Sequence, residues 1–337
     1  MNTSSLKYFL LLLGFFVFAD VTMAQKSRKS TKRTTKTKTK ANVKESAPTT
    51  VDTTTAVVAP LPPPAPANDT LVKSVKKSLR PDYAVEVMSM NDRTPLNYEY
   101  LRADDAVYRH KLMRELDCRE KMNLPFMHSA DADNGNQRFI SILLQALQDS
   151  MVTAFSDERF TTPMTKSEVS KMVAGDEIEV PLYDTLGVLV GTQKKRNEVN
   201  LDSFYRFHIK EEVIFDKESS RLFWRILGIA PVKNIVTSSG VDLGASELFW
   251  VYYPDLRPIL SKYEVYNGKN FSGRMSWEEL FENRMFSARI IKTSMDNSRD
   301  LLIKNYPGLS ENALLQLFEG ENVKERILNY EQDLWSY

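Results

Sequence analysis

Histidine and acidic side chains are the residues in this sequence best suited to chemistry, and their spacing limits what that chemistry could be. The three histidines, His110, His128 and His208, have no second histidine or cysteine at the separation typical of a metal site. His110 stands among charged residues, and His208 falls on the polar side of an alternating strand pattern. We therefore expect both to be surface groups rather than ligands.

Two carboxylate pairs, Asp131 with Asp133 and Glu211 with Glu212, are the remaining candidates for acid–base chemistry. A glycoside hydrolase needs two carboxylates that converge across a cleft, which spacing alone does not show. Residues 130–136, ADADNGN, resemble a calcium loop, but the glycine comes one position early and the final glutamate is missing. The sequence therefore favours no metal and no cofactor, and an exported hydrolase that acts on glycans stays open as the alternative.

Glycine and serine motifs give no support to other enzyme classes. The sequence contains no G-x-S-x-G turn, no G-x-x-x-x-G-K-[ST] loop and no G-x-G-x-x-G fingerprint. Nucleophilic, phosphate-binding and dinucleotide-binding roles therefore lack a motif. We expect a protein that is not an enzyme.

The N-terminus has the three-part pattern of a secretory signal peptide. Lys7 precedes an apolar run over residues 8–18, and Thr22-Met23-Ala24 precedes Gln25. The run is shorter than the ~20 residues that span a bilayer, so we expect residues 1–24 to be removed and Gln25 to begin the mature protein. Lipidation needs a cysteine at the cleavage point, and Cys118 is the chain's single cysteine. The sequence therefore predicts an exported protein that has no lipid anchor of its own.

Residues 25–79 lack the apolar side chains that a folded core needs. Nine Lys or Arg residues fall between Lys26 and Lys44, and a stretch rich in Thr, Ala and Pro follows to residue 68. The basic arm is interpreted as a solvated tether, with contact to an anionic membrane surface and nucleic-acid binding as alternatives. Residues 81–337 contain 31 bases and 40 acids, because residues 1–80 contribute 14 of the 45 bases and 4 of the 44 acids. This acidic balance argues against a nucleic-acid partner.

Residues 80–337 are long enough for one mixed domain, and the patterns in them predict an α+β fold. An antiparallel β meander is expected from three strands at 204–215, 222–230 and 247–253. We expect flanking helices at 104–123, at 139–147, after the capping sequence Thr165 to Glu168, and from Ser276 to Met285. Beyond residue 297, two or three short helices are expected, broken at Pro307-Gly308 and at Gly320.

Five sequence blocks together resemble the GldN/PorN family of the type IX secretion and gliding machinery of the Bacteroidetes. The resemblance covers roughly residues 80–337 and depends on the ordered combination of blocks rather than on any one of them. The blocks are YRHKLMRELDCREKMNLPF (108–126), RFHIKEEVIFDKESSRLFWRILGIAP (206–231), LFWVYYPDLRPILSKYEVYN (248–267), MSWEELFENRMFSARI (275–290) and the terminal DLWSY (333–337).

The resemblance implies a periplasmic structural subunit that works by protein contact. In this family the protein associates with an outer-membrane lipoprotein, PorK or GldK, in large rings that also involve self-association. It meets the periplasmic parts of the motor proteins PorM or GldM. The segment RELDCREK belongs to the first of these blocks, so the exposed face of the expected helix 104–123 becomes a candidate contact surface, with Arg114, Cys118 and Arg119 as contact residues. For Cys118 the alternatives are a small semi-buried residue and an intermolecular disulfide.

Overall fold

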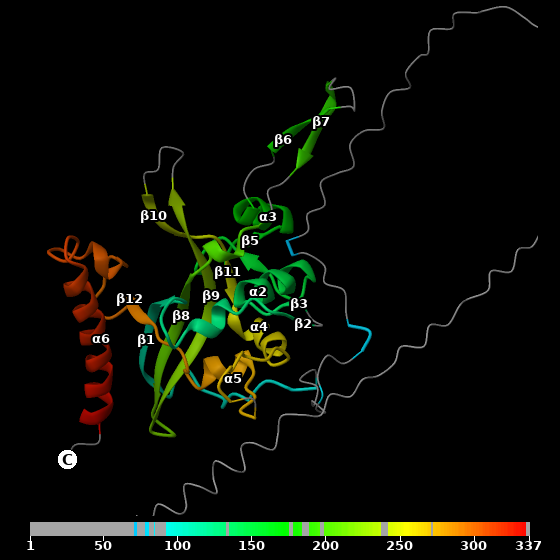
Figure 1. Cartoon of the computed structure of the whole chain (residues 1–337). Helices are drawn as coiled ribbons and strands as arrows, with labels where there is room; N and C mark the ends of the chain where they lie inside the picture. Colours follow the sequence, from blue (N-terminus) through cyan, green and yellow to red (C-terminus); the bar gives the residue numbers. More distant parts are fainter. Residues whose placement is uncertain are drawn as a thin grey trace, which may run out of the picture. The chain divides into compact units, whose positions relative to one another are not determined.

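An antiparallel sheet forms the centre of the protein, and helices flank it (Figure 1). The computed structural model describes residues 92–132, 135–174, 178–183, 189–195, 199–236, 242–270 and 272–334, with short pieces at 71–72, 78–80 and 84. The expected signal peptide and basic arm lie outside the described residues. The architecture confirms the α+β class that the sequence predicts.

The strands of the main sheet follow the order β12-β1-β8-β9-β11-β4-β5, and β10 also pairs with β9. Every neighbouring pair is antiparallel. The strands are β1 (Ala106–Asp117), β4 (Ala154–Phe155), β5 (Pro163–Met164), β8 (Arg206–Asp216), β9 (Arg221–Val236), β10 (Asp242–Glu247), β11 (Trp250–Tyr252) and β12 (Arg289–Thr293).

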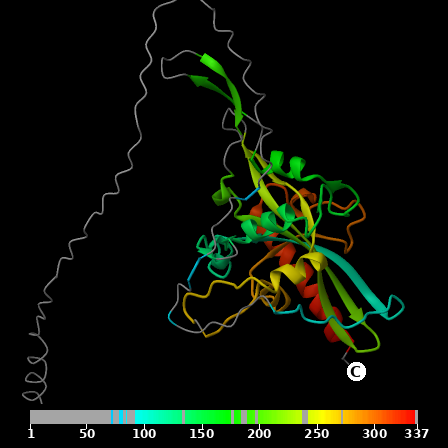
Figure 2. The same cartoon turned by 90° about the vertical axis from the view of Figure 1, so that its right-hand side faces the viewer.

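The long β8–β9 hairpin confirms the strand pair expected at 204–215 and 222–230. Its register runs from Asp216↔Arg221 at the turn to Arg206↔Val232, with a bulge between Lys210 and Glu211. β9 continues beyond the expected end to Val236, where β10 pairs with it. The hairpin turn lies at the same end of the sheet as the C-terminal end of the last helix (Figures 1 and 2).

The expected first helix, 104–123, is wrong, because residues 106–117 form strand β1. The apolar positions Tyr108, Leu112 and Leu116 recur every four residues, a spacing that fits a helix but also keeps them on one face of a strand. β1 lies between β8 and β12 and pairs with both, so Leu112 to Leu116 are buried on both faces. Tertiary pairing therefore outweighs the local helical pattern.

Helices α2, α4 and α5 lie on one side of the sheet and close the main core. The ring centroid of Phe139 on α2 lies 5.0 Å from that of Trp277 on α5 and 5.2 Å from that of Phe207 on β8. The helices are α2 (Phe139–Gln148), α4 (Tyr253–Leu260) and α5 (Trp277–Glu282).

Both expected capping boxes are present. The Glu279 backbone N–H donates to Ser276 Oγ at 3.1 Å, and the Ser276 N–H donates back to the Glu279 carboxylate at 2.8 Å. At α3 (Lys166–Ala174), Thr165 and Glu168 exchange the same two bonds at 3.3 and 2.7 Å. Each box satisfies N–H groups that a helix start leaves unpaired, although α5 ends at Glu282 rather than at the expected Met285.

Arg257 on α4 anchors the extended segment 92–100 to the helices. Its guanidinium pairs with Glu278 at 2.7 Å and lies 3.7 Å from the centre of the Tyr98 ring. The Tyr98 hydroxyl donates to Glu282, and Tyr253 donates to the same carboxylate at 3.1 Å. Helix α4, which directly follows strand β11, thus presents a buried cation to two acids of α5.

The C-terminal region contains one long helix rather than several short ones. Gly308, with φ of +82°, ends the preceding segment, so the expected break at Pro307-Gly308 is confirmed. The expected break at Gly320 is wrong, because α6 (Ala313–Asp333) continues through it beside β12. A Cβ at position 320 would lie 2.9 Å from the backbone oxygen of Ile290, so glycine permits close packing instead of ending the helix.

The remaining short elements connect these parts. Two separate two-stranded sheets, β2–β3 and β6–β7, are also antiparallel. These elements are η1 (Leu124–Met127), β2 (Asp131–Ala132), β3 (Gly135–Asn136), β6 (Ile178–Tyr183), β7 (Leu189–Lys195), η2 (Leu201–Ser203) and η3 (Ile303–Asn305).

Candidate functional site

The three residues expected to form one contact surface are separated by the structure. Arg114 lies in the middle of β1 with 8% of its surface exposed, and Cys118, directly after β1, has 0% exposed. Arg119 is exposed in the following turn, where it pairs with Asp117 at 2.6 Å and covers the Tyr205 ring. Of the three, Arg119 alone is presented to solvent.

Cys118 is a packed core residue. Its backbone N–H donates to the carbonyl of Tyr205 at 2.8 Å, and burial raises the pKa of its thiol. A neutral, enclosed thiol is a poor nucleophile. The burial agrees with the interpretation of Cys118 as a small core residue and goes further than the semi-buried position that was expected.

Arg114 belongs to a buried Arg–Glu–Arg cluster. Glu211 on β8 is 0% exposed, and it accepts from Arg114 Nε at 2.9 Å and from Arg284 at 2.7 Å. Both guanidinium groups also face the Trp224 ring, at 5.2 and 4.9 Å from its centroid. Two cations on one carboxylate leave an excess positive charge, which the π face of Trp224 helps to accommodate.

The pair Glu211 and Glu212 does not converge. Adjacent strand residues point to opposite faces of a sheet, and Glu212 pairs with Arg109 at 2.5 Å while Glu211 pairs with Arg114. Each carboxylate therefore has its own arginine on its own face. The pair does not provide the two facing acids that glycoside hydrolysis requires.

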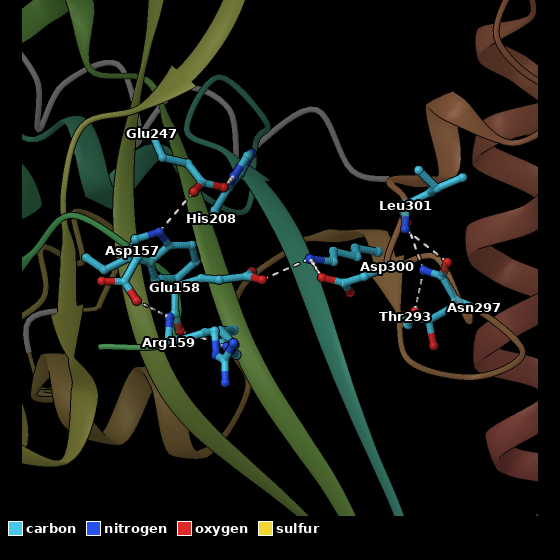
Figure 3. A network of polar contacts seen from close by, with 12 residues as sticks. Asp157, Glu158, Arg159, His208, Glu247, Thr293, Asn297, Asp300 and Leu301 are labelled. Carbon is cyan, nitrogen blue, oxygen red and sulfur yellow. Dashed lines mark hydrogen bonds and ion pairs between the residues drawn. The ribbon is translucent and has the colours of Figure 1, made fainter. Parts of the chain in front are cut away.

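His208 lies between two carboxylates inside the sheet rather than on the surface as expected. It is 8% exposed, and its Nδ1 atom lies 2.7 Å from Glu247 (Figure 3). Its Nε2 atom lies 3.5 Å from Glu115, an ion-pair separation longer than a good hydrogen bond. Glu115 also pairs with Arg289, and Glu247 accepts from Trp250 Nε1 at 2.9 Å.

The two acids favour the charged form of His208. Burial by itself would lower the pKa of His208, but Glu115 and Glu247 outweigh it and raise the pKa above its ordinary value. Burial likewise opposes ionisation of Glu115, yet His208 and Arg289 lower the pKa of Glu115 to about 2. A general base needs a free ring lone pair. Both ring nitrogens of His208 face carboxylates, which favours its charged form over a free base.

A pocket of about 480 Å³ lies over the His208 cluster. Glu115, Glu247 and Arg289 line one part of it, and Gln316 and Leu317 from the first turns of α6 line another. Its volume falls within the range of small-molecule sites. Its carboxylates are already paired with His208 and Arg289. The charges that line the pocket therefore do not indicate which class of ligand it would bind.

The other two histidines make ordinary contacts. His110 lies 3.3 Å from Ser294 Oγ and edge-on to Tyr108, and His128 stacks on Tyr266 with centroids 3.8 Å apart. In the part of the chain that the structure describes, no group of three or more His, Cys, Asp or Glu side chains is placed to hold a metal ion. Asp131 is described, whereas residues 133 and 134 of the calcium-like loop lie outside the described residues.

Helix α6 exposes more large apolar side chains than it buries. Its buried residues are Gly320, Val323 and Ile327, which form one narrow stripe. Exposed apolar side chains gather mostly in its first two turns, a pattern found at protein interaction sites. These exposed residues are Leu314, Leu315, Leu317, Phe318 and Leu328.

Sequence reasoning missed His208, Glu211 and Arg284 as parts of buried clusters. A signal was present, because Lys210-Glu211-Glu212 places charged residues in succession within a strand whose flanks are apolar. Such an interruption of the alternation coincides with the bulge between Lys210 and Glu211. The partners, however, come from distant segments that no local pattern connects.

A family model described as gliding motility associated protein GldN matches residues 101–336, a range that includes the whole main sheet and α6. A search of curated proteins found no match. Among the described residues, no helix is long and apolar enough to cross a membrane. Since the family model spans most of the sequence, the chain belongs to the GldN family.

Proposed function

We propose that the protein is a non-catalytic structural subunit of the type IX secretion and gliding machinery and works in the periplasm. Membership of the GldN family makes the chain a component of that machinery, and the match over residues 101–336 is the observation that carries the proposal. The partners are the outer-membrane lipoprotein GldK or PorK, the periplasmic parts of GldM or PorM, and further copies of the chain within a ring.

The surface of α6 supports a role in protein contact. A helix that buries only Gly320, Val323 and Ile327 leaves the five exposed apolar side chains named above in contact with water. Exposed apolar clusters of this kind are stabilised when a partner covers them. The predicted surface on β1 is less suitable, because Arg114 and Cys118 are buried there.

The test measures membrane retention and assembly. The full chain should fractionate with the outer membrane and form large particles with the lipoprotein, and both properties should be lost in a strain without that lipoprotein. A double variant, Leu314→Lys with Phe318→Glu, should fold normally and assemble poorly. Met172→Glu changes an exposed apolar residue on α3 and is the matched control. Normal assembly of the α6 variant would remove this surface from the proposal, and retention without the lipoprotein would contradict partner-dependent attachment.

Export by the N-terminal segment is part of the same proposal. The pattern of Lys7, the apolar run and Thr22-Met23-Ala24 supports cleavage before Gln25. Intact-mass measurement of protein from the periplasm should show loss of residues 1–24. A mass that retains Met1 would contradict the proposed route of export.

A further inference from the structure

Two adjoining pockets form a groove on the sheet, apart from the His208 cluster. Their volumes are about 350 and 310 Å³, and both are lined by Lys111, Glu158, Arg159 and Lys210. The first extends to Lys292 and Asp300, and the second to Arg109, Phe160 and Tyr252. We call the two pockets together the basic groove.

Positive charge exceeds negative charge in this groove, although acids outnumber bases in the folded region as a whole. Within the described part of the chain, no carboxylate lies at ion-pair distance from Lys111, Arg159 or Lys210. Lys210 instead donates to the backbone oxygen of Glu158 at 2.7 Å. The cations of the groove are Arg109, Lys111, Arg159, Lys210 and Lys292, and its acids are Glu158, Glu212 and Asp300.

The cations are close enough to repel one another. Burial lowers the pKa of Lys210, and nearby Lys111 and Lys292 lower it further against the opposing effect of Glu158. Like charges held together in a half-buried groove cost free energy unless an anion joins them. The groove therefore favours a negatively charged ligand.

A rigid loop forms one wall of the basic groove. The Asp157 carboxylate accepts from the backbone N–H groups of Arg159 at 3.1 Å and Thr162 at 2.9 Å. Phe160 has φ of +60°, and its ring occupies the space beside Gly228, where a Cβ would approach it to 2.5 Å. A left-handed phenylalanine is costly and persists only where its surroundings hold it. The loop thus presents Glu158 and Arg159 in a fixed position (Figure 3).

Lys292 forms ion pairs with two carboxylates in the basic groove. Its ammonium lies 2.9 Å from Glu158 and 2.8 Å from Asp300. Asp300 has 71% of its side chain exposed and belongs to the segment after β12. Its carboxylate therefore occupies a position that a carboxylate from another chain could take over.

We propose that the basic groove binds an acidic peptide segment through its side-chain carboxylates. Phosphate fits less well, because the carboxylate and the carbonyl oxygen of Glu158 line the groove and repel a doubly charged anion more strongly than a singly charged one. Met113, Leu227 and Tyr252 give the groove apolar walls that suit the carbon atoms of a peptide. Binding of such a peptide does not require ring assembly, so it can be measured with the full chain alone.

The test compares a fluorescent peptide of alternating Asp and Leu with a matched Asn and Leu peptide, using anisotropy and the full chain. The double variant Lys111→Gln with Arg159→Gln changes two exposed residues and should weaken binding of the Asp peptide about fivefold or more. Lys262→Gln, which removes an exposed cation outside the groove, should leave it unchanged. Thermal unfolding should be the same for all three proteins.

A photo-cross-linking form of the Asp peptide separates the groove from the basic arm at residues 26–44. Mass spectrometry should find the cross-links near Lys111, Arg159 and Lys292. Equal binding of the Asn peptide, cross-links confined to the arm, or an unchanged affinity of the double variant would overturn the proposal. Displacement of the peptide by inorganic phosphate at matched ionic strength would overturn the choice of ligand.

Discussion

Arg114 on β1 and Glu211 on β8 form a buried ion pair of 2.9 Å, at a place where the sequence predicts an exposed helix face. Arg284, which follows α5, completes the cluster at 2.7 Å from the same carboxylate. The cluster links strands β1 and β8 to the turn that follows helix α5. Because Glu211 is fully enclosed, the loss of one partner leaves a charge that water cannot solvate.

Reversal of the charge at Arg114 should destabilise the protein strongly. Arg114→Glu would place a second carboxylate beside Glu211, and breaking a buried pair costs about 3–5 kcal/mol of unfolding free energy. Arg119→Glu, on the exposed turn, should change it by about 0.5 kcal/mol or less. Urea unfolding followed by circular dichroism measures both. Equal midpoints for the two variants would contradict the buried position of Arg114.

Local signals predicted the elements whose hydrogen bonds close within a few residues. The capping sequences at Thr165 and Ser276 specify two helix starts, and the apolar stripe from Phe139 specifies α2. The β8–β9 hairpin is local in the same sense, since its turn joins Asp216 to Arg221, only a few residues later in the sequence. These parts of the fold follow from the sequence alone.

Features that depend on distant partners were not predictable. β1 is a strand because Arg114 lies opposite Ile209 on β8 and Ile290 on β12, and no short window contains all three. His208 is buried for the same reason, as its carboxylates come from Glu115 and Glu247. A polar residue in a strand indicates a solvent face unless the fold supplies a counter-charge.

Truncation of Trp250 should destabilise the protein strongly. Its side chain is fully buried, and Trp250→Ala should cost about 3–5 kcal/mol of unfolding free energy through the cavity left behind. Trp250→Phe should cost less, because it keeps a six-membered aromatic ring in the core, although it loses the bond to Glu247, worth about 1 kcal/mol. Chemical unfolding curves rank the two variants. A smaller loss for alanine than for phenylalanine would contradict the packing described for β11.

The His208 cluster should make stability depend on pH in two windows. The pKa of His208 is raised above 6.5, so its contribution is complete below pH 6.5 and is lost as pH rises through the folded pKa. The pKa of Glu115 is lowered from 4.5 to about 2, so its contribution is complete above pH 4.5 and is lost as pH falls toward 2. Urea unfolding at a series of pH values measures both effects.

Two single variants distinguish the pH range in which His208 loses its contribution to stability from the range in which Glu115 does. The difference in unfolding free energy between the native chain and His208→Gln should shrink as pH rises above 6.5. The difference between the native chain and Glu115→Gln should shrink as pH falls below 4.5. A His208→Gln difference that grows with pH would show that the histidine is neutral in the folded protein.

A methyl group at Gly320 should destabilise the protein, although the same change stabilises most helices. Gly→Ala inside a helix usually gains about 1 kcal/mol, but a Cβ at position 320 would lie 2.9 Å from the backbone oxygen of Ile290. Backbone cannot move aside as a flexible side chain can, so α6 must shift away from β12. We expect Gly320→Ala to lose about 1 kcal/mol or more of unfolding free energy. Asn322→Ala, at an exposed position of the same helix, controls for helix propensity and should have little effect or a small gain. A rise in stability for Gly320→Ala would mean that α6 does not pack against β12 as closely as its position indicates.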